Sequence, residues 1–238
     1  MQYHLDTIPV WEAMESHCEC PLCYLAEKCD TMEVERSLGG SVMEPSVRIQ
    51  VNELGFCSAH HKALFAMQNR LGHALMVDSH CKELLKKLDQ LRKTPPQKKA
   101  GLWAKKTDSL ADTLHSLCTT CILCDAVEAH MQRYGYTFVQ LYKKDTAFRE
   151  KWEASQGVCM PHAATLLEHA AKHLNEPHYS NFVTSLLTKL YEVVKENEKD
   201  LEWFTLKFDY RNQSKPWGNS KNALERTINR LRGKIVDL

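Results

Sequence analysis

The segments Cys20-Pro-Leu-Cys23 and Gly55-Phe-Cys57-Ser-Ala-His60 decide the fold of this 238-residue chain, because the chain contains the same pattern twice. The second copy reads Cys121-Ile-Leu-Cys124 and Gly157-Val-Cys159-Met-Pro-His162. The two cysteine pairs begin 101 residues apart, and the two Gly-x-Cys-x2-His segments begin 102 residues apart. This near-constant register predicts an internal duplication.

Each copy of the pattern supplies three cysteines and one histidine. Three thiolates and one imidazole form a complete tetrahedral shell for zinc, with no position left for a substrate. We therefore predict two zinc ions per chain, one in each half. The predicted ligands are Cys20, Cys23, Cys57 and His60 in the first half, and Cys121, Cys124, Cys159 and His162 in the second.

The Gly-x-Cys-x2-His segment has features of a turn that leads into a helix. Glycine permits a sharp turn, and the cysteine then lies near a helix N-terminus, where the helix dipole favours a thiolate. The histidine three residues later lies on the same face of the helix. If the ligands are grouped by sequence half, each metal joins two segments that lie about 35 residues apart in the sequence, with a pair of helices between them.

Three alternatives use the same residues. An iron–sulfur cluster accepts this ligand set, since histidine can replace a thiolate there. Cys-x2-Cys with a proline also resembles a thioredoxin-like redox pair, but that motif needs a strand–helix setting, and the second copy lacks the proline. In the simplest alternative the cysteines are buried fillers and the histidines are incidental. The remaining cysteines are Cys18, Cys29, Cys81 and Cys118. They are interpreted as small buried fillers, with Cys18 and Cys118, which lie next to the ligand pairs, as alternative ligands.

Apolar residues follow helical spacing along nearly the whole chain, and strand-like alternation is nowhere sustained. The first predicted helix is a short one capped by Asp6 or Thr7, with Pro9 in its first turn. The other predicted helices cover residues 24–38, 45–54, 59–91, 102–118, 125–144, 146–155, 160–174, 178–204 and 219–232. The fold class is therefore all-α, with two tandem helical modules related by duplication and each stapled by a Cys3His metal site.

Composition changes indicate the domain boundaries. Residues 94–101, with two prolines, two lysines and a closing glycine, form the clearest linker. We predict a first metal-binding module at 1–93, the linker at 94–101, a second module at 102–206 and a C-terminal extension at 207–238.

Charge and hydropathy favour a cytoplasmic protein. The net charge of +1 argues against a nucleic-acid footprint over the whole chain, and no apolar run reaches membrane-spanning length. No secretory signal is visible at the start. Six of the ten cysteines lie in metal spacing, which indicates a reducing compartment.

The C-terminal extension breaks the repeat with a cluster of aromatic and charged residues. Asp209, Tyr210 and Arg211 are predicted to line a site for a partner or an anionic ligand, with the guanidinium group offering two parallel hydrogen bonds. The alternative is that this segment caps the core of the second module, with its charged side chains in a structural network.

The doubled motif, followed by Lys207-Phe208-Asp209-Tyr210-Arg211-Asn212, resembles a family of uncharacterised bacterial proteins of unknown function that is common in anaerobic Firmicutes. The resemblance covers almost the whole chain, including the helix at 223–233, and the cysteines and histidines of the family map onto the eight predicted ligands. It implies an architecture and a cytoplasmic, bacterial origin, but no reaction.

These observations lead to three functional hypotheses. The leading one is a non-catalytic zinc-binding protein that acts through an unknown protein partner or small ligand. The second is an iron–sulfur or thiol redox protein that uses the same cysteines. The third is an enzyme with a pocket between the modules, for which the sequence indicates no catalytic residues.

Overall fold

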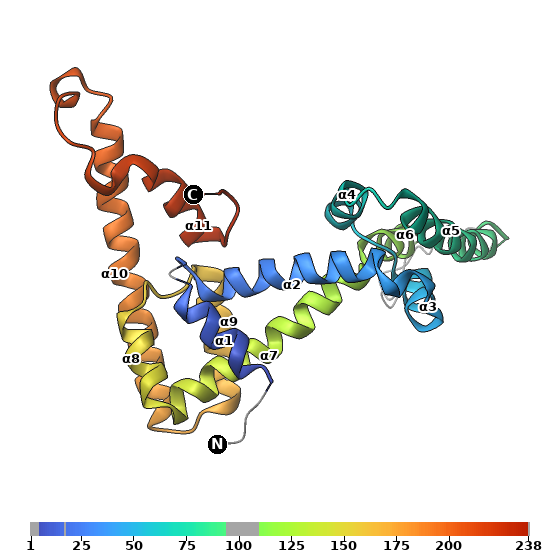
Figure 1. The fold of residues 1–238 in the computed structure, drawn as a ribbon, viewed down its shortest axis with the longest axis horizontal. Helices are drawn as coiled ribbons and strands as arrows, with labels where there is room; N and C mark the ends of the chain where they lie inside the picture. The colour runs from blue at the N-terminus through green and yellow to red at the C-terminus, as the bar shows by residue number, and fades with distance from the viewer. Residues whose placement is uncertain (1–4, 17, 94–109, 238) are drawn as a thin grey trace, which may run out of the picture. The chain divides into compact units, whose positions relative to one another are not determined.

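The computed structural model describes residues 5–16, 18–93 and 110–237 (Figure 1). Within these ranges the chain forms eleven α-helices and three short 3-10 helices, without any β-strand. The prediction of an all-α fold is therefore confirmed. The predicted linker at 94–101 and the start of the helix predicted at 102–118 lie outside the described residues.

The helices follow the predicted order, with small shifts at their ends. In chain order they are α1 (Thr7–Glu15), α2 (Pro21–Leu38), η1 (Gly40–Met43), α3 (Pro45–Leu54), α4 (Ser58–Ala66), α5 (Arg70–Lys93), α6 (Leu110–Thr119), α7 (Ile122–Lys144), α8 (Thr146–Ala154), α9 (Met160–His173), α10 (His178–Leu206), η2 (Tyr210–Asn212), η3 (Gly218–Asn222) and α11 (Ala223–Arg232).

The single helix predicted over residues 59–91 is wrong, because the structure divides it into α4 and α5. Gln68 has φ 63°, a left-handed conformation that cannot continue a right-handed helix. The side-chain oxygen of Asn69 then accepts a hydrogen bond of 3.0 Å from the backbone N–H of Gly72. This bond satisfies one of the free donors at the start of α5.

The described chain divides into two compact units. The first combines residues 1–28 with 130–238, and the second consists of residues 29–129. The chain passes from the first unit to the second within α2 and returns within α7. The boundaries predicted near residues 93, 101 and 206, and the internal duplication itself, stay predictions.

The first unit has a core of large aromatic side chains. The ring of Phe138 meets those of Phe148 and Trp152 edge-on, with centroids 5.0 and 5.5 Å away, and all three side chains are fully buried. The indole N–H of Trp152 donates to the hydroxyl of Ser185 at 2.8 Å. Nearer the C-terminus, α9, α10 and α11 pack against one another (Figure 1).

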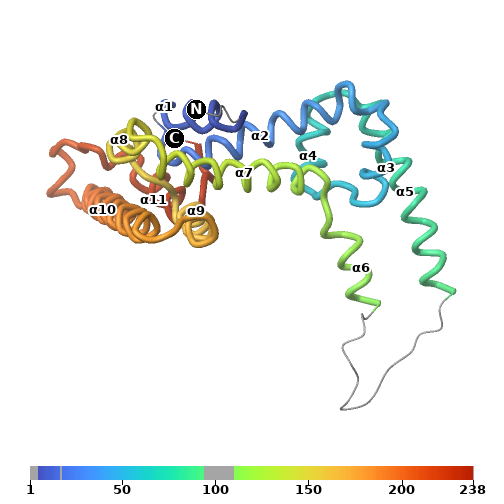
Figure 2. Tube along the Cα trace, turned by 90° about the horizontal axis from the view of Figure 1, so that it is seen from below, coloured from blue at the N-terminus to red at the C-terminus, as the bar shows by residue number. Residues whose placement is uncertain are grey.

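The second unit has a smaller, aliphatic core. Helices α3, α4 and α5 gather in it (Figure 2), and α5 packs against the other two. The buried residues at its centre are Val34, Leu38, Val42, Val51, Leu64, Met76, Cys121 and Leu123. Both units thus bury apolar side chains that contribute stability whether or not a metal is bound.

No single helix in the described ranges is both long enough and apolar enough to cross a membrane. Helices α6 and α7 pass the same test only when they are taken together, and they are bent by 67° at their junction.

Candidate metal centres

The structure brings all eight predicted ligands together in two groups, but it pairs them across the two halves of the sequence. Site 1 contains Cys20, Cys23, Cys159 and His162, and site 2 contains Cys57, His60, Cys121 and Cys124. Within each site the ligand atoms lie within 4.8 Å of one another. Each site lies wholly within one compact unit. The prediction that each half of the sequence closes its own site was therefore wrong.

Helix length explains the crossed pairing. A helix rises about 1.5 Å per residue, so α2 with 18 residues spans about 27 Å, whereas α3 with 10 residues covers about 15 Å. The chain therefore does not return along α3 to the start of α2. The same holds for α7 and α8, whose lengths are 23 and 9 residues. In the structure, the Cys-x2-His segment that follows each short helix meets the other cysteine pair.

Each site is built from the N-termini of two helices. Cys57 and Cys159 are the N-cap residues of α4 and α9, with extended backbone, and His60 and His162 are the third residues of these helices. The Cys-x2-Cys pairs lie at the starts of α2 and α7. Since helix N-termini carry partial positive charge, both sites favour thiolates, as the sequence predicted.

The two predicted glycine turns are confirmed. Gly55 and Gly157 have φ values of 64° and 76°, in the left-handed region that side chains disfavour. A Cβ atom on Gly55 would also lie 2.8 Å from Nε2 of His80. Glycine is therefore required there for both conformation and space.

The spacing of the ligand atoms in site 1 fits a single tetrahedral ion. The sulfur of Cys159 lies 3.7 Å from that of Cys20 and 3.6 Å from that of Cys23. Nδ1 of His162 lies 3.2 to 3.4 Å from the three sulfurs. Metal–sulfur bonds of about 2.3 Å at tetrahedral angles place two sulfurs about 3.8 Å apart. The observed separations approach this value.

Site 2 has the same geometry. The sulfurs of Cys57 and Cys124 lie 3.7 Å apart. Nδ1 of His60 lies 3.2 Å from the sulfurs of Cys57 and Cys121 and 3.4 Å from that of Cys124. Both histidines thus direct Nδ1, rather than Nε2, toward the cysteines.

Site 2 is supported by a carboxylate and by backbone hydrogen bonds. Nε2 of His60 lies 2.7 Å from the carboxylate of Asp30, which holds the ring with Nδ1 facing the sulfurs. The backbone N–H of Ile122 donates to the carbonyl of Gly55 at 3.1 Å. The hydroxyl of Thr120 donates to the carbonyl of Leu54 at 2.7 Å. These bonds hold the glycine turn against the start of α7.

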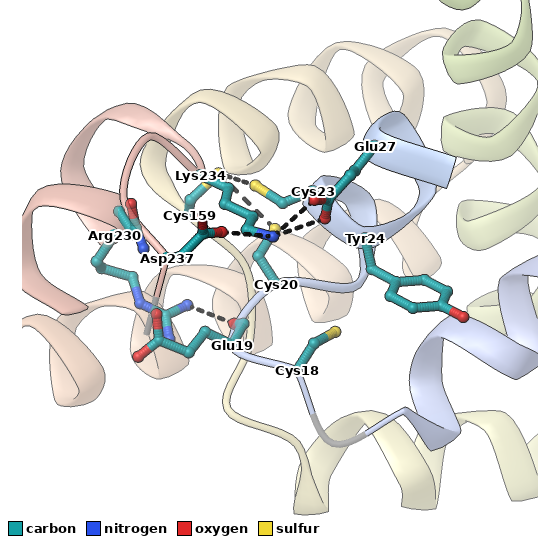
Figure 3. A pocket seen from close by; sticks show the side chains of 11 residues that line it. Cys18, Glu19, Cys20, Cys23, Tyr24, Glu27, Cys159, Arg230, Lys234 and Asp237 are labelled. Carbon is teal, nitrogen blue, oxygen red and sulfur yellow. Dashed lines mark hydrogen bonds and ion pairs between the residues drawn. The ribbon is translucent and has the colours of Figure 1, made fainter. Parts of the chain in front are cut away.

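Site 1 is supported differently, because the corresponding residues differ. Pro21 occupies the position of Ile122 and has no N–H to donate, and Met131 occupies the position of Asp30. Instead, a guanidinium N–H of Arg230 on α11 donates to the carbonyl of Glu19 at 3.0 Å (Figure 3). The C-terminal helix therefore holds the segment that leads into the first cysteine pair.

A pocket of about 360 Å³ opens beside site 1 (Figure 3). It is lined by the three cysteine ligands of site 1 together with Cys18, Glu19, Tyr24, Glu27, Asn229, Arg230, Lys234 and Asp237. Lys234 closes one side of it through hydrogen bonds of 2.8 and 2.7 Å to the carboxylate of Glu27. His162 does not line the pocket, so a molecule there would meet the sulfur face of the site.

In the metal-free protein, the pKa values of the ligands in site 1 are shifted in different directions. Burial raises the pKa of Cys20 well above its usual value. Hydrogen bonds with Cys159 and Cys20 lower the pKa of Cys23. Burial disfavours the charged form of His162, but its bonds to Cys159 and Cys23 outweigh this and raise its pKa to about 9. Site 1 without metal therefore pairs a thiolate with an imidazolium ion.

In site 2, the pKa values of two cysteines are likewise shifted in opposite directions. Burial would raise the pKa of Cys57, but hydrogen bonds from the backbone N–H of His60 and from the neighbouring ligands lower it to about 7. Burial, with the hydrogen bonds from Cys121 and Cys57, raises the pKa of Cys124 to about 12. One thiolate is thus available at neutral pH to begin metal binding.

The predicted C-terminal site lies on an exposed turn. The carboxylate of Asp209 accepts from the backbone N–H of Arg211 at 2.9 Å and from its Nε at 3.1 and 3.0 Å. Tyr210 between them is 80% exposed. The two charged side chains are therefore engaged with each other, and a role for the three residues in binding stays a prediction.

Sequence reasoning missed the residues that support the two sites. Nothing in the sequence distinguished Asp30 as a partner of a metal ligand, because an acidic residue within a helix ordinarily faces solvent. Arg230 and Lys234 lie in the C-terminal segment, which has no counterpart in the first half, so comparison of the repeats could not single them out.

The fold and the sites together define a class of all-α protein with two Cys3His groups that could each hold a metal ion. The chain belongs to DUF6062, a family of unknown function, whose model matches residues 1–237. This confirms a family of unknown function over almost the whole chain, while the bacterial origin and the mapping of motifs stay predictions. Neither the curated proteins nor the solved structures include a match to the chain.

Proposed function

We propose that the protein is a non-catalytic zinc-binding protein that holds one Zn2+ in each of its two sites and acts by binding a protein partner or a small ligand. The observation that carries this proposal is the spacing of the ligand atoms, 3.2 to 3.7 Å in both sites. That spacing suits four donors around one small ion, and a set of three thiolates and one imidazole is typical of structural zinc.

The spacing argues against an iron–sulfur cluster. A cluster places several iron and sulfide atoms between its ligands, and its ligands bind different irons. The ligand atoms would then lie farther apart than the donors of a single ion do.

The thiol redox alternative also has less support. A thioredoxin-like pair needs a strand–helix setting, whereas both cysteine pairs here lie at the starts of helices, α2 and α7, and the second pair lacks the proline. We also propose a reducing compartment such as the cytoplasm, because six of the ten cysteines are arranged as candidate metal ligands.

Four protein ligands leave no coordination position for a substrate, so the proposed zinc ions act by holding segments of the chain together. In site 1 the ion connects the start of α2 to the start of α9, and in site 2 it connects α4 to α7. The role of the protein then depends on the partner or ligand that its helices bind. The nearly neutral charge supports a partner other than nucleic acid.

Elemental analysis after anaerobic purification tests the proposal. We expect about two zinc ions per chain and a colourless protein. Iron together with inorganic sulfide and visible absorption would show that the sites hold an iron–sulfur cluster instead of zinc. A fully reduced protein without metal would refute the proposal.

A further inference from the structure

A groove lined mainly by leucine side chains lies between α5 and α6, which both belong to the second unit (Figure 2). Its volume is about 690 Å³. The ion pair of Asp89 and Arg92 lines it together with five leucines, which are Leu85, Leu88, Leu91, Leu110 and Leu114. None of these residues is a ligand of either candidate metal site.

The leucines of the groove are exposed to an extent that is uncommon for apolar side chains lying together. Leu85 is 65% exposed, Leu110 49% and Leu114 48%. Among the described residues of these two helices, none beyond Met76 of α5 and none of α6 is fully buried. Helices gain most of their stability from packing an apolar face, and apolar side chains gathered on a surface mark a site of interaction.

The spacing of the leucines suits a third helix. On both helices they follow one another at intervals of four and then three residues. They are Leu84, Leu88 and Leu91 on α5, and Leu110, Leu114 and Leu117 on α6. From Leu85 to Arg92 the groove extends about 10 Å along α5, at about 1.5 Å per residue. This length equals two helical turns, so a bound helix would place apolar anchors at positions i, i+4 and i+7.

The walls of the groove carry a net positive charge. Residues 84–93 of α5 and the whole of α6 contain four cations and two carboxylates. Exposed ion pairs within one helix, such as Arg92 with Asp89, contribute little stability, so these cations also attract the charges of a partner. The net charge of the whole chain is only +1, so positive charge is concentrated at the groove.

Charge distinguishes between the apolar segments that could cover these leucines. A second copy of the chain would present the same positive walls. Residues 94–109, which connect the two helices in the sequence, contain four lysines and one aspartate and would add further positive charge. Like charges brought together at a contact weaken it. An apolar stripe flanked by acidic groups is therefore favoured over both.

We propose that this groove binds an amphipathic helix with acidic flanks, which a protein partner contributes. The apolar stripe of that helix packs between the leucines of α5 and α6, and its carboxylates face the cations of α5. A phosphate backbone would leave the leucines unused, and a flat lipid surface would not fill a groove between two helices. This inference rests on the proposed role in binding a partner and deepens it by naming the class of partner, but it does not depend on the metal.

Three designed peptides test the class of partner by fluorescence anisotropy with the full chain. Each has about 18 residues, enough for a helix to form on the protein. The acidic peptide has leucines at helical spacing and glutamates beside them. The basic peptide has lysine in place of each glutamate, and the polar peptide has serine in place of each leucine. We expect the acidic peptide to bind with micromolar affinity, the basic peptide at least tenfold more weakly, and the polar peptide not at all.

Several results would overturn the inference. Equal binding of the acidic and basic peptides would remove the charge argument. A dimer that Leu88→Ser converts to a monomer would assign the groove to a second copy. Binding of the acidic peptide only after Leu102→Ser and Trp103→Ser would assign it to the chain's own connecting segment. Binding to vesicles of phosphatidylglycerol without binding of the acidic peptide would assign it to a membrane.

The metal content of the same sample separates this inference from the proposed zinc sites. Protein that holds two zinc ions but does not bind the acidic peptide refutes the inference and leaves the zinc sites intact. Protein without metal that binds the acidic peptide does the reverse.

Matched leucine variants test the place of binding. Leu114→Ser removes an exposed side chain from the groove and should weaken binding of the acidic peptide at least fivefold. Leu71→Ser, at a 72% exposed position of α5 that does not line the groove, should change it less than twofold. Unchanged binding by Leu114→Ser would contradict the inference.

A charge reversal in the wall of the groove gives a result that loss of structure does not imitate. Arg92→Glu should weaken binding of the acidic peptide and strengthen binding of the basic peptide, whereas unfolding would weaken both. Lys62→Glu, at an exposed position of α4, is the control and should change neither by more than twofold. If Arg92→Glu binds both peptides as the unchanged protein does, the inference is wrong.

Discussion

Paired cysteine substitutions distinguish the crossed grouping of ligands from grouping by sequence half. Cys20→Ser with Cys159→Ser removes two ligands from site 1 and leaves site 2 complete. Cys20→Ser with Cys57→Ser removes one ligand from each site. We expect the first double variant to retain one zinc ion per chain and the second to retain none.

The structure also sets the size of the effect on stability. In site 1, Cys23 and Cys159 are 136 residues apart, and in site 2, His60 and Cys124 are 64 residues apart. Treated as cross-links of the unfolded chain, loops of this length contribute about 5 and about 4 kcal/mol. Loss of site 1 should therefore lower the free energy of unfolding by about 5 kcal/mol through this term alone.

Elemental analysis and native mass spectrometry give the metal content, and urea denaturation gives the free energy of unfolding. Cys81→Ser, at an exposed position, and Cys29→Ser, at a buried one, are the controls and should retain both metals. The reasoning is refuted if the variant with Cys20 and Cys57 replaced keeps one ion while the variant with Cys20 and Cys159 replaced keeps none.

Three further predictions concern single positions. Asp30→Ala should weaken metal binding at site 2 by about 10- to 100-fold in a chelator competition, and should leave site 1 unchanged. Gly55→Ala should destabilise the protein by about 1–3 kcal/mol in urea, because of its φ of 64° and the contact with His80, whereas Gly40→Ala, with open space around it, should not. The pKa of His162 in the metal-free protein, about 9 against an ordinary 6.5, means that its imidazole is protonated at pH 7. Zinc binding should therefore release a proton from His162 at pH 7, in addition to protons from the thiols, and calorimetry in buffers of different ionisation enthalpy should show the number of released protons falling as the pH rises through about 9.

Local features of the protein could be predicted from the sequence, because they depend on neighbouring residues. Helical periodicity predicted an all-α chain, and most helix ends fall within a few residues of the predicted positions. The glycine two residues before Cys57 and its counterpart before Cys159 predicted sharp turns into helices, and the structure has both, with the glycines in the left-handed region. The identity of the eight candidate ligands followed from the spacing of cysteine and histidine within each short segment.

The break between α4 and α5 shows where local reasoning was insufficient. Residues 59–91 have apolar spacing that suits one helix, and no proline or pair of glycines interrupts it. In the structure, the side-chain nitrogen of Asn69 donates to the carbonyl of Leu38 at 2.8 Å while its oxygen caps α5. That carbonyl belongs to a different helix, so the sequence around Asn69 did not contain the signal.

The grouping of the ligands depended on tertiary structure in the same way. Both copies of the motif offer the same donors, so chemistry alone does not say which cysteine pair meets which Cys-x2-His segment. The lengths of α2 and α7, compared with the short α3 and α8, decide it, because a long helix carries the chain away from its first ligands. The sequence by itself thus determined which atoms can hold the ions, whereas the tertiary structure decided which four share each ion, because ligand chemistry is local and the path of the chain is not.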